Sequence, residues 1–226
     1  MKYFYSAAVM GYGEGRSWHK YYTFKTFPRV TKTLTLKPKI GIPFAILKFG
    51  NTVWNRIGLH NIGFYNWLDY YSHRDISNTI VSIAGFVDEL YIMIEALNKL
   101  NVGGIELNFS CPNHRSFRNI KLHRMFSNKH PIYLKLSYNQ DPYDYDLTDV
   151  VGIRLNSVPW FIGGLSGKAA QEKNWSFIKR YKELNVAGCS FTSMDDIKKL
   201  EDMGCKEIGI GSTILTNPKL IDTLNG

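Results

Sequence analysis

Short apolar or β-branched runs alternate along this chain with stretches whose apolar residues recur at helical spacing. Leu90, Ile94 and Leu97 fall on one helix face between Asp88 and Leu100, and the stretch 195–203 repeats this pattern. Strands and helices in alternation are typical of a mainly parallel sheet. Eight strands are predicted, near Phe4–Met10, Arg29–Thr35, Thr79–Ala84, Gly104–Phe109, Ile132–Ser137, Val150–Asn156, Val186–Ser190 and Glu207–Gly211. We therefore predict an α/β fold of the (β/α)8 TIM-barrel type.

The length of the chain indicates a small version of such a barrel. At 226 residues it fits a single domain over residues 1–226, toward the short end of the usual range for this fold. We therefore expect a truncated barrel in which several crossover helices are trimmed or missing. The segment Thr35–Gly58 contains too many Pro, Gly and Asn residues for a helix, and we predict a hairpin there on the catalytic face.

Composition narrows the class of protein. Hydrophobic residues make up 44% of the chain and aromatic residues 14%, which favours a folded domain over disorder. The sequence has no apolar run long enough for a membrane span and no N-terminal signal segment. Its three cysteines lack metal-ligand spacing, so we expect reduced thiols, a cytoplasmic location and no metal site.

The net charge of +9 is unevenly placed. Fifteen of the 28 Lys and Arg residues lie in two windows without any acidic residue, 15–68 and 107–140. Such windows form a solvated basic surface or a positive field that attracts an anion, such as a phosphate, a carboxylate or RNA. Composition does not choose among these.

The segment Gly104–Asn113, which reads Gly-Ile-Glu-Leu-Asn-Phe-Ser-Cys-Pro-Asn, carries the strongest functional signal. An apolar run typical of a buried strand ends in Asn108, Ser110, Cys111 and Asn113. Polar groups and a thiol at the C-terminal end of a parallel strand are typical of an active site. A buried structural cysteine is the alternative, but it does not account for the polar residues around it.

This segment resembles the catalytic loop of the flavin-dependent dihydroorotate dehydrogenases of the soluble, Cys-type class 1, Glu-Leu-Asn-(Leu/Phe)-Ser-Cys-Pro-Asn. Further segments resemble the family in the same order along the chain. They are Thr31-Lys32-Thr33, Asn55–Asn61, Lys135 with its neighbours, Asn156-Ser157, Gly163–Gly167, and the strand ends at Gly188-Cys189 and Gly211-Ser212.

The resemblance implies oxidation of dihydroorotate to orotate in pyrimidine biosynthesis, with FMN as cofactor. It assigns the general base to Cys111 and further catalytic roles to Lys32 and Ser110. The implied substrate-binding residues are Asn55, Ile57, Gly58, Leu59, Asn108, Asn113, Asn156 and Ser157. The implied cofactor-binding residues are Ala7, Ala8, Lys32, Asn108, Lys135, Gly163, Gly164, Gly188, Cys189, Gly211 and Ser212.

The chain also departs from the family pattern. Ser6-Ala7-Ala8 replaces Ala-Ser-Gly, Gly188-Cys189 replaces Gly-Gly, and only five residues separate Ser157 from Gly163. The linker between Lys135 and Asn156 is shortened as well. These changes bear on flavin retention and on oligomerisation, for which a homodimer is one open arrangement.

Two other functions stay open at this point. A degenerate, non-catalytic homologue would serve as a scaffold or subunit, which the trimmed helices and Cys189 favour. A flavin reductase acting on pyrimidines in RNA fits the charge of +9, but the sequence has no RNA-binding extension. For the leading function, the electron acceptor is open among fumarate, a quinone, and NAD through an iron–sulfur partner.

Overall fold

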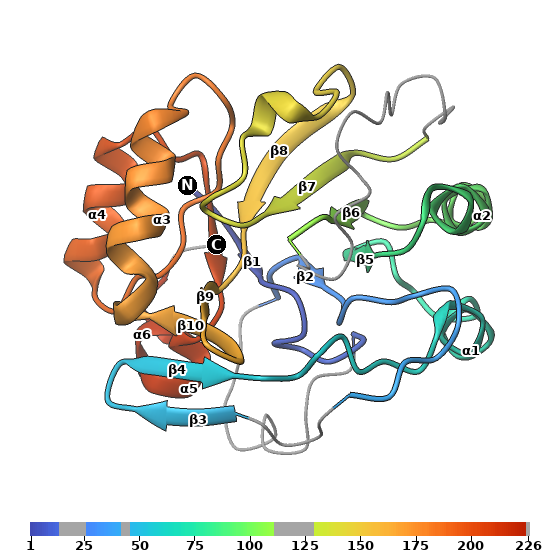
Figure 1. Ribbon diagram of the computed structural model, residues 1–226, viewed down its shortest axis with the longest axis horizontal. Helices are drawn as coiled ribbons and strands as arrows, with labels where there is room; N and C mark the ends of the chain where they lie inside the picture. Colours follow the sequence, from blue (N-terminus) through green and yellow to red (C-terminus); the bar gives the residue numbers. More distant parts are fainter. Residues whose placement is uncertain (14–25, 42–45, 111–128, 225–226) are drawn as a thin grey trace.

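The computed structural model describes residues 1–13, 26–41, 46–110 and 129–224. Its main feature is a parallel seven-stranded sheet with the order β11-β1-β2-β5-β6-β7-β8 (Figure 1). The strands are β1 (Lys2–Tyr5), β2 (Arg29–Val30), β5 (Thr79–Ile83), β6 (Gly104–Asn108), β7 (Ile132–Leu136), β8 (Val150–Leu155) and β11 (Glu207–Ile210). Each of them lies within or next to a predicted strand.

Residues 186–188 connect the two edges of this sheet. Val186 forms a parallel bridge with Ile153 of β8, and Gly188 forms one with Ile208 of β11. The Ala187 amide donates to the Ile153 carbonyl at 2.8 Å. This closing segment takes the place of the predicted strand Val186–Ser190, although it is too short to form a continuous ladder. The sheet is therefore a nearly closed barrel, which confirms the predicted fold class.

Helices pack around the barrel (Figure 1). They are α1 (Phe64–Tyr71), α2 (Val87–Leu97), α3 (Lys168–Arg180), α4 (Met194–Asp202), α5 (Thr213–Thr216) and α6 (Lys219–Asp222). Between β7 and β8 the crossover contains only the short 3-10 helix η4 (Pro142–Asp144). The barrel is therefore trimmed at this crossover, as its length predicts. Among the helices of the described ranges, none is long and apolar enough to cross a membrane.

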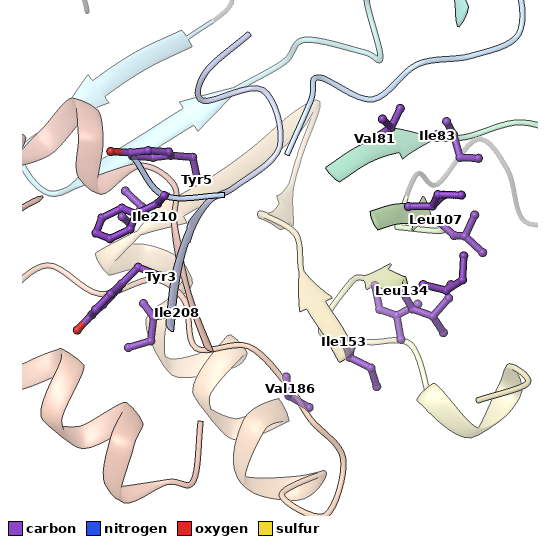
Figure 2. Packing of buried hydrophobic residues seen from close by; sticks show 14 of the residues in the cluster. Tyr3, Tyr5, Val81, Ile83, Leu107, Leu134, Ile153, Val186, Ile208 and Ile210 are labelled. Atoms are coloured by element: carbon purple, nitrogen blue, oxygen red, sulfur yellow. The ribbon is translucent and has the colours of Figure 1, made fainter. Parts of the chain in front are cut away.

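Alternate residues of each strand face different cores. Leu107, Leu134 and Ile153 belong to the large core that the strands share with the helices, part of which Figure 2 shows. Phe4 and Ile80 face the other way and form a small apolar cluster inside the barrel with Val30 and Ala187. Val30 pairs with Ile80, the second residue of β5, so this cluster lies toward the N-terminal end of the barrel.

A second, antiparallel sheet with the order β3-β4-β10-β9 lies at the other end. Its strands are β3 (Ile46–Phe49), β4 (Thr52–Asn55), β9 (Val158–Trp160) and β10 (Gly163–Gly167). The hairpin predicted within Thr35–Gly58 is confirmed as β3 and β4. The segment Gly163–Gly167, which resembles the family in its glycines, forms the strand β10.

The glycines of β10 explain why it is a strand. Gly164 pairs with Asn55 of β4 and with Pro159 of β9, so the backbone has partners on both sides. A Cβ atom on Gly163 would lie 2.5 Å from the Asn55 carbonyl oxygen and 2.7 Å from the Trp54 indole nitrogen. Glycine therefore allows a close approach between two excursions that are distant in the sequence.

Candidate active site

The C-terminal ends of the barrel strands and the second sheet enclose one cavity of about 950 Å³. Active sites of barrels of this kind lie at the same end. Most of the residues predicted from the sequence line this cavity. They are Ala7, Ala8, Lys32, Asn55, Ile57, Gly58, Leu59, Asn108, Ser110, Lys135, Asn156, Ser157, Gly163, Gly164, Cys189, Gly211 and Ser212.

The three remaining predicted residues are Cys111, Asn113 and Gly188. Cys111 and Asn113 lie outside the described residues. Gly188 borders a separate, smaller cavity of about 20 Å³ instead. A Cβ atom on Gly188 would meet Ile208 at 3.1 Å and Leu200 at 3.2 Å, so a glycine here permits close packing between the closing segment, β11 and α4.

The loop after β4 places Ile57, Gly58 and Leu59 at the cavity. Gly58 and Leu59 both have positive φ angles, 63° and 58°. The buried Asn61 side chain fixes this conformation, because its amide nitrogen donates to the Leu59 carbonyl at 2.8 Å and its oxygen accepts from the Gly63 amide at 2.8 Å. Asn61 therefore has a structural role next to the candidate binding residues.

A directed chain of hydrogen bonds begins at the cavity. The amide of Asn156 donates to Ser110 Oγ at 2.7 Å, and Ser110 Oγ donates to Asn108 Oδ1 at 2.6 Å. The amide of Asn108 then donates to Thr33 Oγ1 at 2.9 Å. Each amide orientation follows from its partners, since Asn108 must accept from Ser110 and donate to Thr33.

The chain continues into the barrel interior. Ser82 Oγ donates to Glu106 Oε1 at 2.8 Å and lies 2.9 Å from Thr33 Oγ1. Because Ser82 gives its only hydroxyl proton to Glu106, Thr33 is the donor to Ser82. All of these donors therefore point in the direction of the Glu106 carboxylate.

Glu106 lies at the centre of a buried ionic cluster. Its oxygens lie 4.0 Å from Lys135 Nζ and 3.5 Å from Arg154 Nη1, and the Arg154 side chain is 5% exposed. The Arg154 guanidinium also stacks on the rings of Phe4, at 4.0 Å, and Tyr133, at 3.8 Å. These contacts stabilise a guanidinium that has little access to water.

Lys135 lies where this cluster meets the cavity, and its side chain is 12% exposed. Burial lowers the pKa of Lys135 below its ordinary value, the Glu106 carboxylate opposes that shift, and Arg154 adds to it. In its charged form, Lys135 would stabilise negative charge on a ligand in the cavity, which it borders.

The resemblance singles out Lys135 as a cofactor-binding residue but gives no sign of the polar residues around it. Glu106 and Arg154 are, like Lys135, charged residues inside strands of otherwise apolar character, and this signal could have identified them. Ser82 and Thr33 have no such signal, because small hydroxyl residues are common in strands.

Cys189 adds a thiol to the cavity wall. Burial raises the pKa of Cys189 to about 12, so the group is neutral at physiological pH. The indole of Trp175 donates to the Cys189 carbonyl at 2.9 Å, and the neighbouring Ser190 has a φ angle of 60°. Asn174, whose buried Oδ1 atom has no hydrogen-bond partner in the structure, also lines the cavity.

Comparison with known proteins gives one family. A family model described as dihydroorotate dehydrogenase matches residues 4–140, which is more than half of the chain. No curated protein matches the chain. The matched part runs from the second half of β1 through β7, while β8 to β11 lie beyond it.

Proposed function

The chain belongs to the dihydroorotate dehydrogenase family, and from this premise we propose that it oxidises dihydroorotate to orotate with FMN in the cytoplasmic synthesis of pyrimidines. The observation that carries the proposal is the single cavity of about 950 Å³ that gathers 17 of the predicted site residues from both halves of the chain. Seven of these 17 lie beyond the part that matches the family: Asn156, Ser157, Gly163, Gly164, Cys189, Gly211 and Ser212.

The residues of the cavity fit FMN. Its volume is at the upper end of the roughly 300–1,000 Å³ of ligand pockets, which suits a flavin together with a small substrate. A Cβ atom on Gly164 would clash with Ser157. The wall therefore leaves room for a ligand at this point only because residue 164 is glycine. A Cβ on Gly211 would meet only ordinary contacts of 3.8 Å or more, so the wall is open at that point.

Cationic side chains and backbone groups would contact different parts of FMN. Lys32 and Lys135 would contact the flavin ring, and Ala7, Ala8 and Asn108 would border it. The ribityl phosphate would lie against the backbone at the end of β11, and the glycines of β10 would leave room for the ribityl chain. The residues there are Gly163, Gly164, Cys189, Gly211 and Ser212.

Amide side chains would bind the substrate. Asn55, Asn108 and Asn156 offer both donors and acceptors, which match the carbonyl and N–H groups of a pyrimidine ring. Ser157 and the main chain of Ile57, Gly58 and Leu59 would complete this set, together with Asn113. The Asn156–Ser110–Asn108 hydrogen bonds would hold these side chains in place before substrate binds.

In the proposed reaction Cys111 removes the C5 proton of dihydroorotate. When bound, FMN would supply the acceptor for the hydride that leaves C6. A thiol with the reference pKa of about 8.5 is only a few per cent ionised at neutral pH, so the rate is expected to rise with pH. Lys135 supplies positive charge where negative charge develops. Ser110, whose hydroxyl is held by Asn108, directly precedes Cys111 and would orient this base.

An absorbance spectrum of the purified protein tests the cofactor. We expect a yellow protein with one FMN per chain, whose flavin bleaches when dihydroorotate is added without oxygen. A protein that stays colourless after incubation with FMN would contradict the proposal and favour a scaffold role.

Substitution of Cys111 tests the mechanism. Cys111→Ala is expected to keep the flavin spectrum and orotate binding, but to slow flavin reduction by roughly 10²–10⁴-fold. Cys111→Ser is expected to be slow as well, because a hydroxyl is a weaker base in the same place. Cys205→Ala is the control, since Cys205 is buried beside Gly188 and away from the cavity. Reduction of Cys111→Ala at the wild-type rate would assign the base to another residue.

A further inference from the structure

The buried ionic cluster is larger than the proposed reaction requires. Besides Lys135 it contains Glu106, which is 1% exposed, and Arg154, which is 4% exposed. Arg154 Nη2 also lies 4.0 Å from the Glu207 carboxylate, whose side chain is 20% exposed. Burying these charges removes their hydration, a cost that their mutual attraction must offset, so Glu106 and Arg154 call for an explanation beyond the proposed reaction.

The small cavity beneath the active site lies inside this cluster. Glu106, Lys135 and Arg154 all border it, and its volume of about 20 Å³ is enough for one water molecule. Arg154 Nε is buried without a hydrogen-bond partner in the structure. The 4.0 Å between Lys135 Nζ and Glu106 Oε1 exceeds a direct hydrogen bond, so a water here could bridge the two groups.

We propose that Glu106 is a positioning residue, whose carboxylate holds the Lys135 side chain as a cation at the floor of the cavity, facing the bound ligand. Ser82 fixes one oxygen of this carboxylate and Arg154 lies against the other. The identity of the ligand as a flavin rests on the function proposed above.

The groups around Lys135 leave Glu106 as its source of negative charge. Arg154 faces it from β8 and opposes its protonation, while Cys189 faces it from the end of the closing segment as a neutral thiol with a pKa of about 12. Within the described ranges, Glu106 is the acidic residue that forms an ion pair with Lys135. Removing its charge therefore leaves Lys135 buried beside a guanidinium, which favours loss of the proton.

A negatively charged Glu106 also agrees with the direction of the hydrogen-bond chain. Thr33 and Ser82 both donate toward Glu106, as a negatively charged end of the chain requires. The same chain begins at Asn156 and Ser110, at the cavity. Glu106 is thus coupled to the substrate side as well as to Lys135.

The first test uses protein without flavin. The ionisation of Lys135 is followed by NMR of ¹³C-labelled lysine, with the signal assigned by its loss in Lys135→Ala. We expect Glu106→Gln to lower the pH midpoint of Lys135 by roughly 1–3 units, the usual effect of a neighbouring opposite charge. The matched control Glu207→Gln removes an acid from the same cluster that contacts Arg154 rather than Lys135, and is expected to shift the midpoint much less.

A second test covers the case in which Glu106→Gln does not fold. Ser82→Ala keeps the charge but removes the hydrogen bond that orients it, and is expected to lower the midpoint in the same direction by a smaller amount. An unchanged Lys135 midpoint in every variant that folds would overturn the proposal. Because flavin is absent, this result is independent of the proposed function.

With FMN bound, the midpoint potential provides a third readout. At pH values above the new titration midpoint of Lys135, Glu106→Gln is expected to lower the reduction potential of FMN. In a Lys135→Ala background the same substitution is expected not to lower this potential. Equal effects in both backgrounds would show that Glu106 acts independently of Lys135, and would overturn the proposal. If wild-type protein does not bind FMN, the proposed function fails while the NMR result still decides the role of Glu106.

Discussion

At the scale of single residues, Ala8 is held in a backbone conformation that suits glycine. Its φ angle is 70°, where an L side chain costs roughly 1–2 kcal/mol. The dehydrogenase family has glycine at the matching position, so the structure gives a physical reason for that pattern. The same residue lines the active-site cavity.

We predict that Ala8→Gly stabilises the protein. Relief of strain exceeds the entropic cost of glycine, for a net gain of about 0.5–1 kcal/mol and a rise in melting temperature of about 1–4 °C. The control is Ala7→Gly, because Ala7 has no positive φ angle and glycine should lower the melting temperature there. Thermal unfolding followed by circular dichroism measures both, and a lower melting temperature for Ala8→Gly would contradict the account.

The thiols of Cys189 and Cys205 are predicted to react slowly with alkylating reagents. Burial raises the pKa of Cys189 to about 12 and that of Cys205 to about 11, so at pH 8 only about 1 in 10,000 and 1 in 1,000 of them are thiolates. Cys111 at the reference pKa of about 8.5 would be about one quarter ionised. Labelling with iodoacetamide, read by peptide mass spectrometry, should modify Cys111 first, and equal rates for Cys189 and Cys111 would contradict this ordering.

Single residues also show how far the sequence predicts the site. Lys135 could be placed inside the barrel, because alternation in a strand assigns it to the face opposite its apolar neighbours. The pairing of Lys135 with Glu106 could not be predicted, because it depends on the register between β6 and β7. In the sequence, Ala8 is only a departure from the family pattern, and its positive φ angle is evident only in the structure.

At the scale of elements, two excursions from the barrel build one wall of the cavity. The hairpin β3–β4 follows β2, the hairpin β9–β10 follows β8, and β4 pairs with β10. The sequence predicted the first hairpin from its local turn residues. It did not predict the second, because the pairing with β4 that makes Gly163–Gly167 a strand is not local.

Gly164 of β10 gives a prediction at this scale. A Cβ atom there would clash with Ser157 Oγ and lie 2.9 Å from its Cβ, so Gly164→Ala must displace a cavity-lining side chain. We expect a loss of roughly 1–3 kcal/mol of stability and weaker orotate binding, measured by thermal unfolding and by titration of the flavin absorbance.

The matched control is Gly50→Ala in the turn of the β3–β4 hairpin. Gly50 has a φ angle of 55° and no atom within 4 Å of an added Cβ, so alanine costs backbone strain of roughly 1–2 kcal/mol without touching the cavity. Orotate binding should be unchanged in this variant. Equal loss of orotate affinity in the two variants would mean that Ser157 is not the residue through which Gly164 acts.

At the scale of the whole molecule, the barrel depends on the part of the chain beyond the family match. The match ends at residue 140, yet β1 pairs with β11 and β7 pairs with β8. Without residues 149–226 both of these strands would have an open edge, and parallel strands with open edges tend to aggregate. The two parts should therefore fold only together.

A split between Thr148 and Asp149, which are both exposed, tests this dependence. We expect fragments 1–148 and 149–226 to be insoluble or unfolded when expressed alone, and to copurify as a 1:1 complex with a cooperative melt when expressed together. Ile153→Asp in the smaller fragment buries a charge where the side chain is now 2% exposed, and should abolish copurification. A fragment 1–148 that melts cooperatively as a soluble monomer would contradict the prediction. The family-matched part would then be a domain in itself, and the ring closure through residues 186–188 would serve the active site alone.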